Sequence, residues 1–166
     1  PEYFCLIGQH DRDKLALKEA FGTGPIQDFL RACARELGLW LVGGTLPLAA
    51  DVEDRVFNSV LAYNPQGDCV ARYDKIHLFD VHVKGDQVYK ESLDVQAGKR
   101  LALAKIGDLK LGIGICYDLR FPELFRKLSL KGMNCLALPS AFTSVTGKAH
   151  WDVLTRARAI ENQAWL

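Results

Sequence analysis

The sequence predicts an α/β fold, and three observations support this prediction. Short apolar runs alternate along the chain with amphipathic segments of helical spacing. Glycine, proline and asparagine mark most of the boundaries between these segments. No internal repeat, low-complexity tract or linker composition divides the chain, so we expect one domain over residues 1–166.

The first half of the chain predicts one helix and three strands. Apolar residues at helical spacing follow Gly24 and Pro25 and stop before Gly38, which predicts a helix. Residues 39–46 and 56–63 are apolar enough for buried strands. The turn sequence at 64–67 then predicts a hairpin to a strand at 70–73. Residues 80–98 are expected to form a long polar loop of the kind that is usually functional.

The second half predicts strands and helices in alternation. Gly107-Asp108 is a two-residue hairpin signal between strands at 101–106 and 109–115. We expect a helix near 122–131, a strand at 135–138 and a final helix at 147–163. One face of that last helix is expected to carry Trp151, Leu154, Ala157 and Ile160.

Composition and charge indicate a folded protein with small partners. The 166 residues are 49% hydrophobic and 25% charged, which is ordinary for a protein with a substantial core. Lys and Arg number 21 against 20 Asp and Glu, so the net charge of +1 gives no attraction to nucleic acid or to a membrane surface. The sequence shows neither a long apolar run nor a charged-then-apolar leader, so we expect no membrane span and no secretory signal.

The cysteines predict a reducing compartment, which we take to be the cytoplasm. Their number is odd and none stands in C-x-x-C spacing, which argues against both a disulfide framework and a zinc ribbon. The five are Cys5, Cys33, Cys69, Cys116 and Cys135.

Cys116 is the candidate nucleophile. It ends the apolar run 109–116, and a helix can begin at Pro122, so the thiol is expected at the carboxyl end of a strand, where ligands gather in α/β folds. The alternative is structural, because free cysteine often packs as a small buried hydrophobe. A thiol of ordinary pKa also needs a base or a nearby cation before it can attack a carbonyl.

Two sets of partners for Cys116 stay open on spacing alone. One is a Cys-His pair, with His77 or His150 as the base; His10 and His82 are the other histidines. The other set uses the Glu2 carboxylate as base and the Lys75 ammonium as cation and oxyanion donor, since both follow expected strand ends or termini. Each of these side chains also has a plain structural interpretation as an exposed or hydrogen-bonded group.

Metal and nucleotide sites are not predicted. His77 and His82 do not have the i, i+4 spacing of a helical ligand pair, and no further cluster completes a metal site. Gly112-x-Gly114 lacks the third glycine of a dinucleotide fingerprint, so these glycines are expected to allow close packing in a strand.

Three segments resemble signatures of the nitrilase superfamily of carbon-nitrogen hydrolases, and they occur in the order of that family. They are Pro-Glu-Tyr-Phe at 1–4, Arg-Tyr-Asp-Lys-Ile-His-Leu-Phe at 72–79 and Gly-Ile-Cys-Tyr-Asp-Leu-Arg-Phe-Pro-Glu at 114–123. Shorter matches stand at 139–142 and 146–151, so the resemblance covers essentially the whole chain.

The resemblance implies a Glu-Lys-Cys triad that needs no metal or cofactor. Glu2 would take the thiol proton of Cys116, which then forms a thioester with a small amide substrate and releases ammonia or an amine. Lys75 and the backbone N–H of Tyr117 would stabilise the oxyanion. Glu91 matches a second family glutamate that orients the lysine and the substrate.

The resemblance also implies a substrate class. Omega-amidase and deaminated glutathione amidase are the most similar branches, and they act on short 2-oxo acids with a terminal amide or peptide. Arg120 and Thr146 match positions that hold the substrate carboxylate, and Phe142 is a further expected substrate contact. Arg120 has a structural alternative as an ion-pair partner of Asp118 or Glu123. A nitrilase, an N-carbamoyl hydrolase, a Cys-His hydrolase and a non-catalytic scaffold are the alternative functions.

The implied fold is a four-layer α-β-β-α sandwich that forms homodimers or larger homo-oligomers, with the helix at 147–163 facing the partner subunit. The family domain is longer at both ends, so we expect this chain to be a piece of a longer domain. Glu2 would then lie on a frayed terminus, and the piece alone would be weakly active or inactive.

Overall fold

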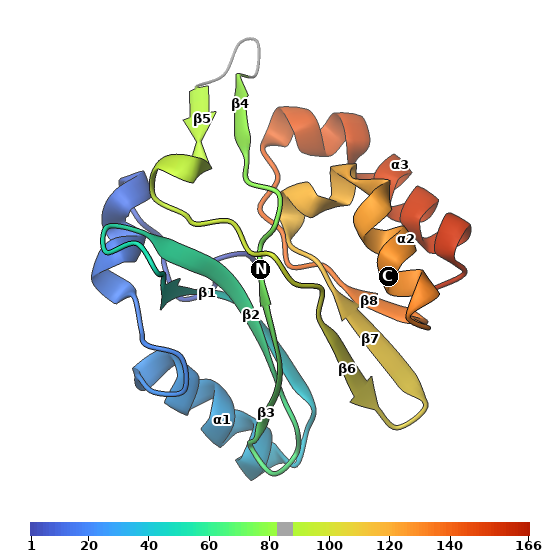
Figure 1. Ribbon diagram of the computed structural model, residues 1–166, viewed down its shortest axis with the longest axis horizontal. Helices are drawn as coiled ribbons and strands as arrows, with labels where there is room; N and C mark the ends of the chain where they lie inside the picture. Colours follow the sequence, from blue (N-terminus) through green and yellow to red (C-terminus); the bar gives the residue numbers. More distant parts are fainter. Residues whose placement is uncertain (83–87) are drawn as a thin grey trace.

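The structure is a computed structural model that describes residues 1–82 and 88–166. The first sheet is antiparallel and has the order β1-β2-β3 (Figure 1). Its strands are β1 (Leu41–Ala49), β2 (Val56–Tyr63) and β3 (Cys69–Asp74). The predicted strands and the hairpin at 64–67 are therefore confirmed, with β1 displaced by two or three residues towards the carboxyl end.

The second sheet has the order β6-β7-β8. Its strands are β6 (Leu103–Ile106), β7 (Leu109–Ile113) and β8 (Cys135–Ala137). Gly107 has a φ of 59°, which suits the two-residue turn that joins the antiparallel strands β6 and β7. Strand β8 runs parallel to β7, and α2 (Pro122–Leu130) forms the crossover between them.

Each sheet has helices on its outer side (Figure 1). Helix α1 (Pro25–Leu37) covers the first sheet; it begins at a proline and ends at Gly38, whose left-handed φ of 63° suits a helix C-cap. Helices α2 and α3 (Ser144–Asn162) cover the second sheet. The short 3-10 segments are η1 (Asp11–Leu17), η2 (Glu91–Leu93) and η3 (Cys116–Arg120).

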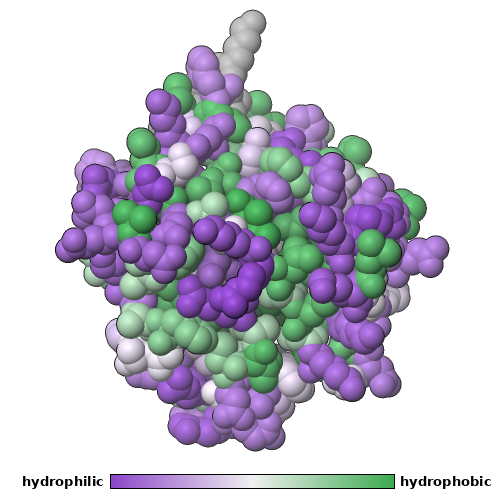
Figure 2. Space-filling view, viewed as in Figure 1, coloured by the Kyte–Doolittle hydropathy of each residue, from purple (hydrophilic) through white to green (hydrophobic). Residues whose placement is uncertain are grey.

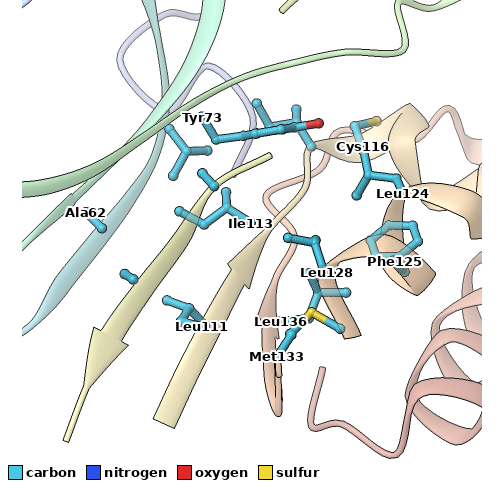
Figure 3. Close-up of a cluster of buried hydrophobic side chains, with 14 residues drawn as sticks. Ala62, Tyr73, Leu111, Ile113, Cys116, Leu124, Phe125, Leu128, Met133 and Leu136 are labelled. Carbon is cyan, nitrogen blue, oxygen red and sulfur yellow. The ribbon is translucent and has the colours of Figure 1, made fainter. Parts of the chain in front are cut away.

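Two hydrophobic clusters hold these layers together. Leu30 and Ala34 of α1 pack with Leu46 and Leu61 on the outer face of the first sheet. The second cluster joins the inner face of the first sheet to the second sheet and to α2 (Figure 3). Strand β2 contributes to both clusters because its alternate residues point to opposite faces. The order of layers is therefore helix, sheet, sheet, helix, which confirms the predicted four-layer α/β sandwich.

Gly112 in β7 and Gly114 just after this strand permit close packing, as predicted. A Cβ at Gly112 would lie 2.4 Å from Met133 Sδ and 3.2 Å from Leu128 Cδ1. A Cβ at Gly114 would lie 3.3 Å from Phe125 Cε1. These glycines therefore let α2 approach the sheet closely.

Two sequence expectations, about residues 80–98 and about the face of α3, are wrong. Residues 80–98 are not one irregular loop, because β4 (Asp80–His82) pairs antiparallel with β5 (Val88–Lys90), and η2 follows; part of the expected loop, 83–87, lies outside the described residues. On α3, Ile160 is 76% exposed although Trp151, Leu154 and Ala157 are half-buried. Steps of three residues drift around a helix of 3.6 residues per turn, so the fourth member leaves the shared face.

The surface carries apolar side chains as well as charged ones. Figure 2 shows hydrophobic surface beside and below a hydrophilic patch near the middle of this face. In the parts of the chain that the structure describes, we find no helix with the length and apolar character needed to cross a bilayer.

Candidate active site

The Glu2 side chain is held in place by contacts of its neighbours with β1. Pro1 O accepts a hydrogen bond from Thr45 N at 3.2 Å, and Tyr3 N donates to Thr45 Oγ1 at 2.6 Å. Gly44 makes this approach possible, because a Cβ there would lie 2.4 Å from Pro1 O and the φ of the residue is 98°. The side chain of Glu2 is only 7% exposed. The register of β1 is irregular between Val42 and Thr45, and the residues on either side of Glu2 bind the strand there. The expectation of a frayed Glu2 is therefore wrong.

Lys75 binds two carboxylates from distant parts of the chain. Its Nζ lies 2.7 Å from Glu2 Oε1 and 2.8 Å from Glu91 Oε2, and the residue is 1% exposed. Glu91 is the first residue of η2, and its Oε2 also accepts from Phe79 N at 2.7 Å. Burial by itself would lower the pKa of Lys75, but the carboxylates of Glu2 and Glu91 outweigh it and raise the pKa above its usual value. The ammonium is therefore a fixed positive charge at neutral pH.

Asn58 is a functional candidate that the sequence reasoning missed. Its Nδ2 donates to Glu2 Oε1 at 2.8 Å and to Glu91 Oε1 at 3.2 Å, so one amide group aligns both carboxylates around Lys75. Asn58 is fully buried in the middle of β2. The available signal was a polar amide within the apolar run that predicts a buried strand. Because buried polar groups have hydrogen-bond partners, such an amide indicates a polar site nearby.

Cys116 lies on a strained turn directly after β7. Strand β7 ends at Ile113, and Cys116 has a φ of 43°, in the left-handed region that side chains avoid. Its N–H is already used, donating to Pro139 O at 2.9 Å. Burial and the Glu2 carboxylate raise the pKa of the thiol, and the Lys75 ammonium and a backbone hydrogen bond from Ala141 oppose this only in part. The resting thiol is therefore protonated and needs a base.

Asp118 joins the lysine segment to the cysteine turn. The fully buried carboxylate accepts from the Tyr73 hydroxyl at 2.7 Å and from Ile115 N at 2.9 Å through Oδ2. Its Oδ1 accepts from His77 N at 3.0 Å and lies 2.7 Å from His77 Nδ1. Figure 3 shows the oxygen of Tyr73 directed towards the turn that bears Cys116. The sequence reasoning treated Asp118 only as a motif member and possible ion-pair partner, and so missed this connection.

One cavity of about 450 Å³ brings most of the predicted residues together. It is lined by both glutamates, by Lys75 and Cys116, and by three further predicted residues, Tyr117, Phe142 and Thr146. A cavity of this size suits a small organic molecule.

Arg120, predicted to bind the substrate carboxylate, does not line this cavity. Its guanidinium lies over the rings of Tyr117 and Phe142, at 5.9 Å and 5.6 Å from their centroids, and Nη1 is 3.3 Å from His150 Nδ1. It therefore contacts two aromatic residues of the cavity wall through cation–π interactions. The alternative ion pair with Asp118 or Glu123 is absent from the described residues as well.

The histidines predicted as a base for Cys116 are occupied elsewhere. His77 binds Asp118 and stacks on Phe121 with ring centroids 3.7 Å apart, and His150 contacts Arg120. Neither lines the cavity that holds Cys116, whereas His10 does. Among residues 1–82 and 88–166, no group of three or more His, Cys, Asp or Glu side chains is arranged to hold a metal ion.

Comparisons with known proteins identify the family of the chain. A family model described as carbon-nitrogen hydrolase matches residues 1–166. The chain is 45% identical over 147 residues to the deaminated glutathione amidase of Yersinia enterocolitica, covering 87% of this chain and 51% of that protein. It is 37% identical over 143 residues to the omega-amidase NIT2 of Xenopus tropicalis, covering 86% and 51%.

Solved structures share the fold. The NitFhit protein of C. elegans has a TM-score of 0.81 and 37% identity over 99% of this chain and 40% of that one. Saccharomyces cerevisiae Nit3, a nitrilase-superfamily member, has a TM-score of 0.79 and 32% identity over 93% of this chain and 53% of that one. The chain spans 51% and 61% of the lengths of two deaminated glutathione amidases that it matches.

Proposed function

The chain belongs to the carbon-nitrogen hydrolase family, and from that premise we propose that the protein hydrolyses a small linear amide through a cysteine thioester. The observation that carries the proposal is the meeting of Glu2, Lys75, Glu91 and Cys116 at one cavity, with Lys75 Nζ within 2.8 Å of both carboxylates. We treat residues 1–166 as part of one hydrolase domain.

Glu2 is the general base in this proposal. The raised pKa of Cys116 keeps the thiol neutral, and the Glu2 carboxylate is one cause of that shift, so the two groups interact directly. Glu2 takes the thiol proton as Sγ attacks the amide carbonyl carbon. It then returns this proton to the leaving nitrogen, and the C–N bond breaks to give ammonia or an amine and a thioester at Cys116.

Lys75 and the backbone of Tyr117 stabilise the oxyanion. An ammonium has three N–H donors, and two are directed at Glu2 and Glu91, which leaves one for the substrate. Because Cys116 N–H donates to Pro139 O, the next N–H along the chain, that of Tyr117, is the backbone donor. Each such donor contributes about 2.7–4 kcal/mol to the transition state. Water deprotonated by Glu2 then attacks the thioester, releases the acid and restores the thiol.

The relatives suggest the substrate range. Two of them carry the names deaminated glutathione amidase and omega-amidase, so we propose a linear amide of comparable size. A nitrile or an N-carbamoyl group could be attacked by the same thiol. No metal or cofactor takes part in the proposed steps.

Location and assembly complete the proposal. All five cysteines are free thiols, which supports a cytoplasmic protein.

We also propose a homodimer or larger homo-oligomer that pairs through α3, because Val153 and Ile160 on this helix are 67% and 76% exposed. Elution of the full-length protein as a monomer in size-exclusion chromatography would contradict this assembly.

Ammonia release from a panel of amides, nitriles and N-carbamoyl amino acids tests the proposed reaction in the full-length protein. Cys116→Ala and Lys75→Met should each reduce turnover by about a thousandfold or more. Cys33→Ala is the matched control, since this free cysteine lies on α1 away from the cavity and should leave the rate unchanged. A Cys-His hydrolase would instead tolerate Lys75→Met and lose activity on His77→Ala or His150→Ala. Absence of turnover on every substrate would favour a non-catalytic scaffold.

A further inference from the structure

The backbone carbonyl of Leu119 needs a hydrogen-bond donor that its own turn cannot supply. Leu119 is fully buried and lies in η3, the 3-10 segment that begins at Cys116. In a 3-10 helix, a carbonyl oxygen accepts from the N–H three residues later. For Leu119 that residue is Pro122, which has no N–H. A donor from another part of the chain is therefore required, because an unpaired buried carbonyl is costly.

Arg158 of α3 supplies this donor. Its Nε donates to Leu119 O at 3.0 Å, and the residue is only 7% exposed. Among residues 1–82 and 88–166, Arg158 Nε is the one donor recorded for this oxygen. Helix α3 packs against η3 and against α2, which lies beside it on the outer side of the second sheet (Figure 1). The bond therefore joins a helix of the outer layer to the turn that carries Cys116.

The guanidinium of Arg158 is itself fixed by both outer helices. Its Nη1 donates to Glu161 Oε1 at 3.0 Å, one turn further along α3. Its central carbon lies over the ring of Phe125 in α2, 5.7 Å from the ring centroid. The backbone oxygen of Arg158 accepts from Asn162 Nδ2 at 2.9 Å. The position of Nε is therefore set by α2 and α3 and is independent of the turn that it binds.

Two groups of the proposed reaction depend on where η3 lies. Cys116 begins this segment with a φ of 43°, a strained value that persists only when the surrounding contacts impose it. Tyr117, whose N–H is the proposed oxyanion donor, follows it. The N–H of Cys116 binds Pro139 O at the start of η3, and the carbonyl of Leu119 binds Arg158 near its end. The turn is therefore held from both sides.

We propose that Arg158 is a positioning residue of the reaction: through Leu119 O it holds η3 where the Cys116 thiol can react and the Tyr117 N–H can bind the oxyanion. Arg158 does not line the cavity, so it acts on the rate of the chemical step and not on substrate binding. This inference rests on the proposed amidase function and adds a residue of the outer helix layer to its machinery.

Two substitutions in the full-length protein separate the bond to Leu119 from the ion pair with Glu161. Arg158→Lys keeps a cation for Glu161 but places a methylene where Nε lies, so kcat should fall about ten- to a hundredfold while KM changes less than about threefold. Arg158→Gln loses the charge but can place its amide N–H at the position of Nε, so kcat should stay within about threefold of the parent value. Glu161→Gln is the control, since it leaves the bond to Leu119 in place and should leave kcat unchanged.

The pH dependence of Cys116 alkylation by iodoacetamide, followed by mass spectrometry of the peptide that contains it, separates this inference from the proposed reaction. In Arg158→Lys the half-maximal rate should move to lower pH, because burial and the Glu2 carboxylate, which raise the pKa of the thiol, act less on a displaced turn. Arg158→Gln should keep the parent profile. These profiles decide on the role of Arg158 even if no amide is hydrolysed.

A purely structural role of Arg158 predicts a different result. It would lower the stability of both variants to urea, most in Arg158→Gln, which lacks the ion pair, and would leave kcat and the alkylation profile of the folded protein unchanged. Parent-like kcat and alkylation in Arg158→Lys, or losses in Arg158→Gln as large as those in Arg158→Lys, would overturn the inference.

Discussion

Replacing Asp118 by asparagine tests how the fold sets the distance between Lys75 and Cys116. Each carboxylate oxygen of Asp118 accepts one backbone N–H and faces one side-chain group. In Asp118→Asn, an NH2 group replaces one of these oxygens. Whichever way the amide turns, this NH2 meets a backbone N–H, that of Ile115 or that of His77.

The magnitude follows from this geometry. One buried N–H is left unpaired, at a cost of about 1–3 kcal/mol, and the remaining bonds lose their ionised acceptor, at about 1 kcal/mol in total. The Tyr73 hydroxyl can rotate to accept, and His77 can change tautomer, so these two groups add little. We therefore expect the free energy of unfolding to fall by about 2–4 kcal/mol. Turnover should fall at least tenfold as well, because the turn that presents Cys116 loses an anchor.

Urea unfolding and ammonia release measure the two effects in the full-length protein. Tyr73→Phe is the matched control, because it removes one donor and leaves Asp118 ionised with its other three contacts; it should cost about 1 kcal/mol. If Asp118→Asn is as stable as Tyr73→Phe and equally active, the connecting role of Asp118 is refuted.

Three further predictions concern the position of Glu2 and the protonation of the Cys116 thiol. Gly44→Ala should reduce turnover at least tenfold with little change in KM, because the added Cβ would lie 2.4 Å from Pro1 O and displace Glu2. Gly22→Ala is the control, since Gly22 has a similar positive φ and open space where its Cβ would lie. Equal losses of turnover in the two variants would show that backbone strain alone is responsible. Glu2→Gln should speed alkylation of Cys116 by iodoacetamide at pH 7.5 while slowing amide hydrolysis, since the Glu2 carboxylate raises the thiol pKa; slower alkylation would contradict this. Because the folded thiol has the higher pKa, the native state keeps a proton that the unfolded chain releases above about pH 8.5, so the free energy of unfolding should fall as pH rises beyond that value. Cys116→Ala should flatten this part of the pH profile, and an unchanged slope would show that another group causes it.

The sequence predicted the elements better than their contacts. The period of α1, the hairpin at Gly107 and the strand ending before Cys116 all follow from local patterns of apolar residues, glycine and proline, and they appear in the structure. The hairpin of β4 and β5 was missed because its strands are short and mostly polar, so that no apolar alternation marks them. The face of α3 was misjudged because its four apolar positions follow at steps of three residues, which drift around a helix of 3.6 residues per turn.

The site shows the same division. Motifs pointed to Glu2, Lys75, Glu91 and Cys116, but spacing gave no means of choosing between them and a histidine base. The choice depends on contacts between residues far apart in the chain, such as His77 with Asp118. The place of Arg120 could not be predicted for a related reason: a motif gives the residue, whereas the contacts of its guanidinium with the rings of Tyr117 and Phe142 depend on the fold.

Trapping the acyl-enzyme is the most direct measurement of the central claim that Glu2, Lys75 and Cys116 act together on an amide. The full-length protein is mixed with a small amide, quenched in acid within its first turnovers and digested for mass spectrometry. We expect the peptide that contains Cys116 to gain the mass of the substrate acyl group, and we expect no such gain in Lys75→Met or Cys116→Ala. Ammonia release with no acyl group on Cys116, together with full activity of Cys116→Ala, would contradict the account.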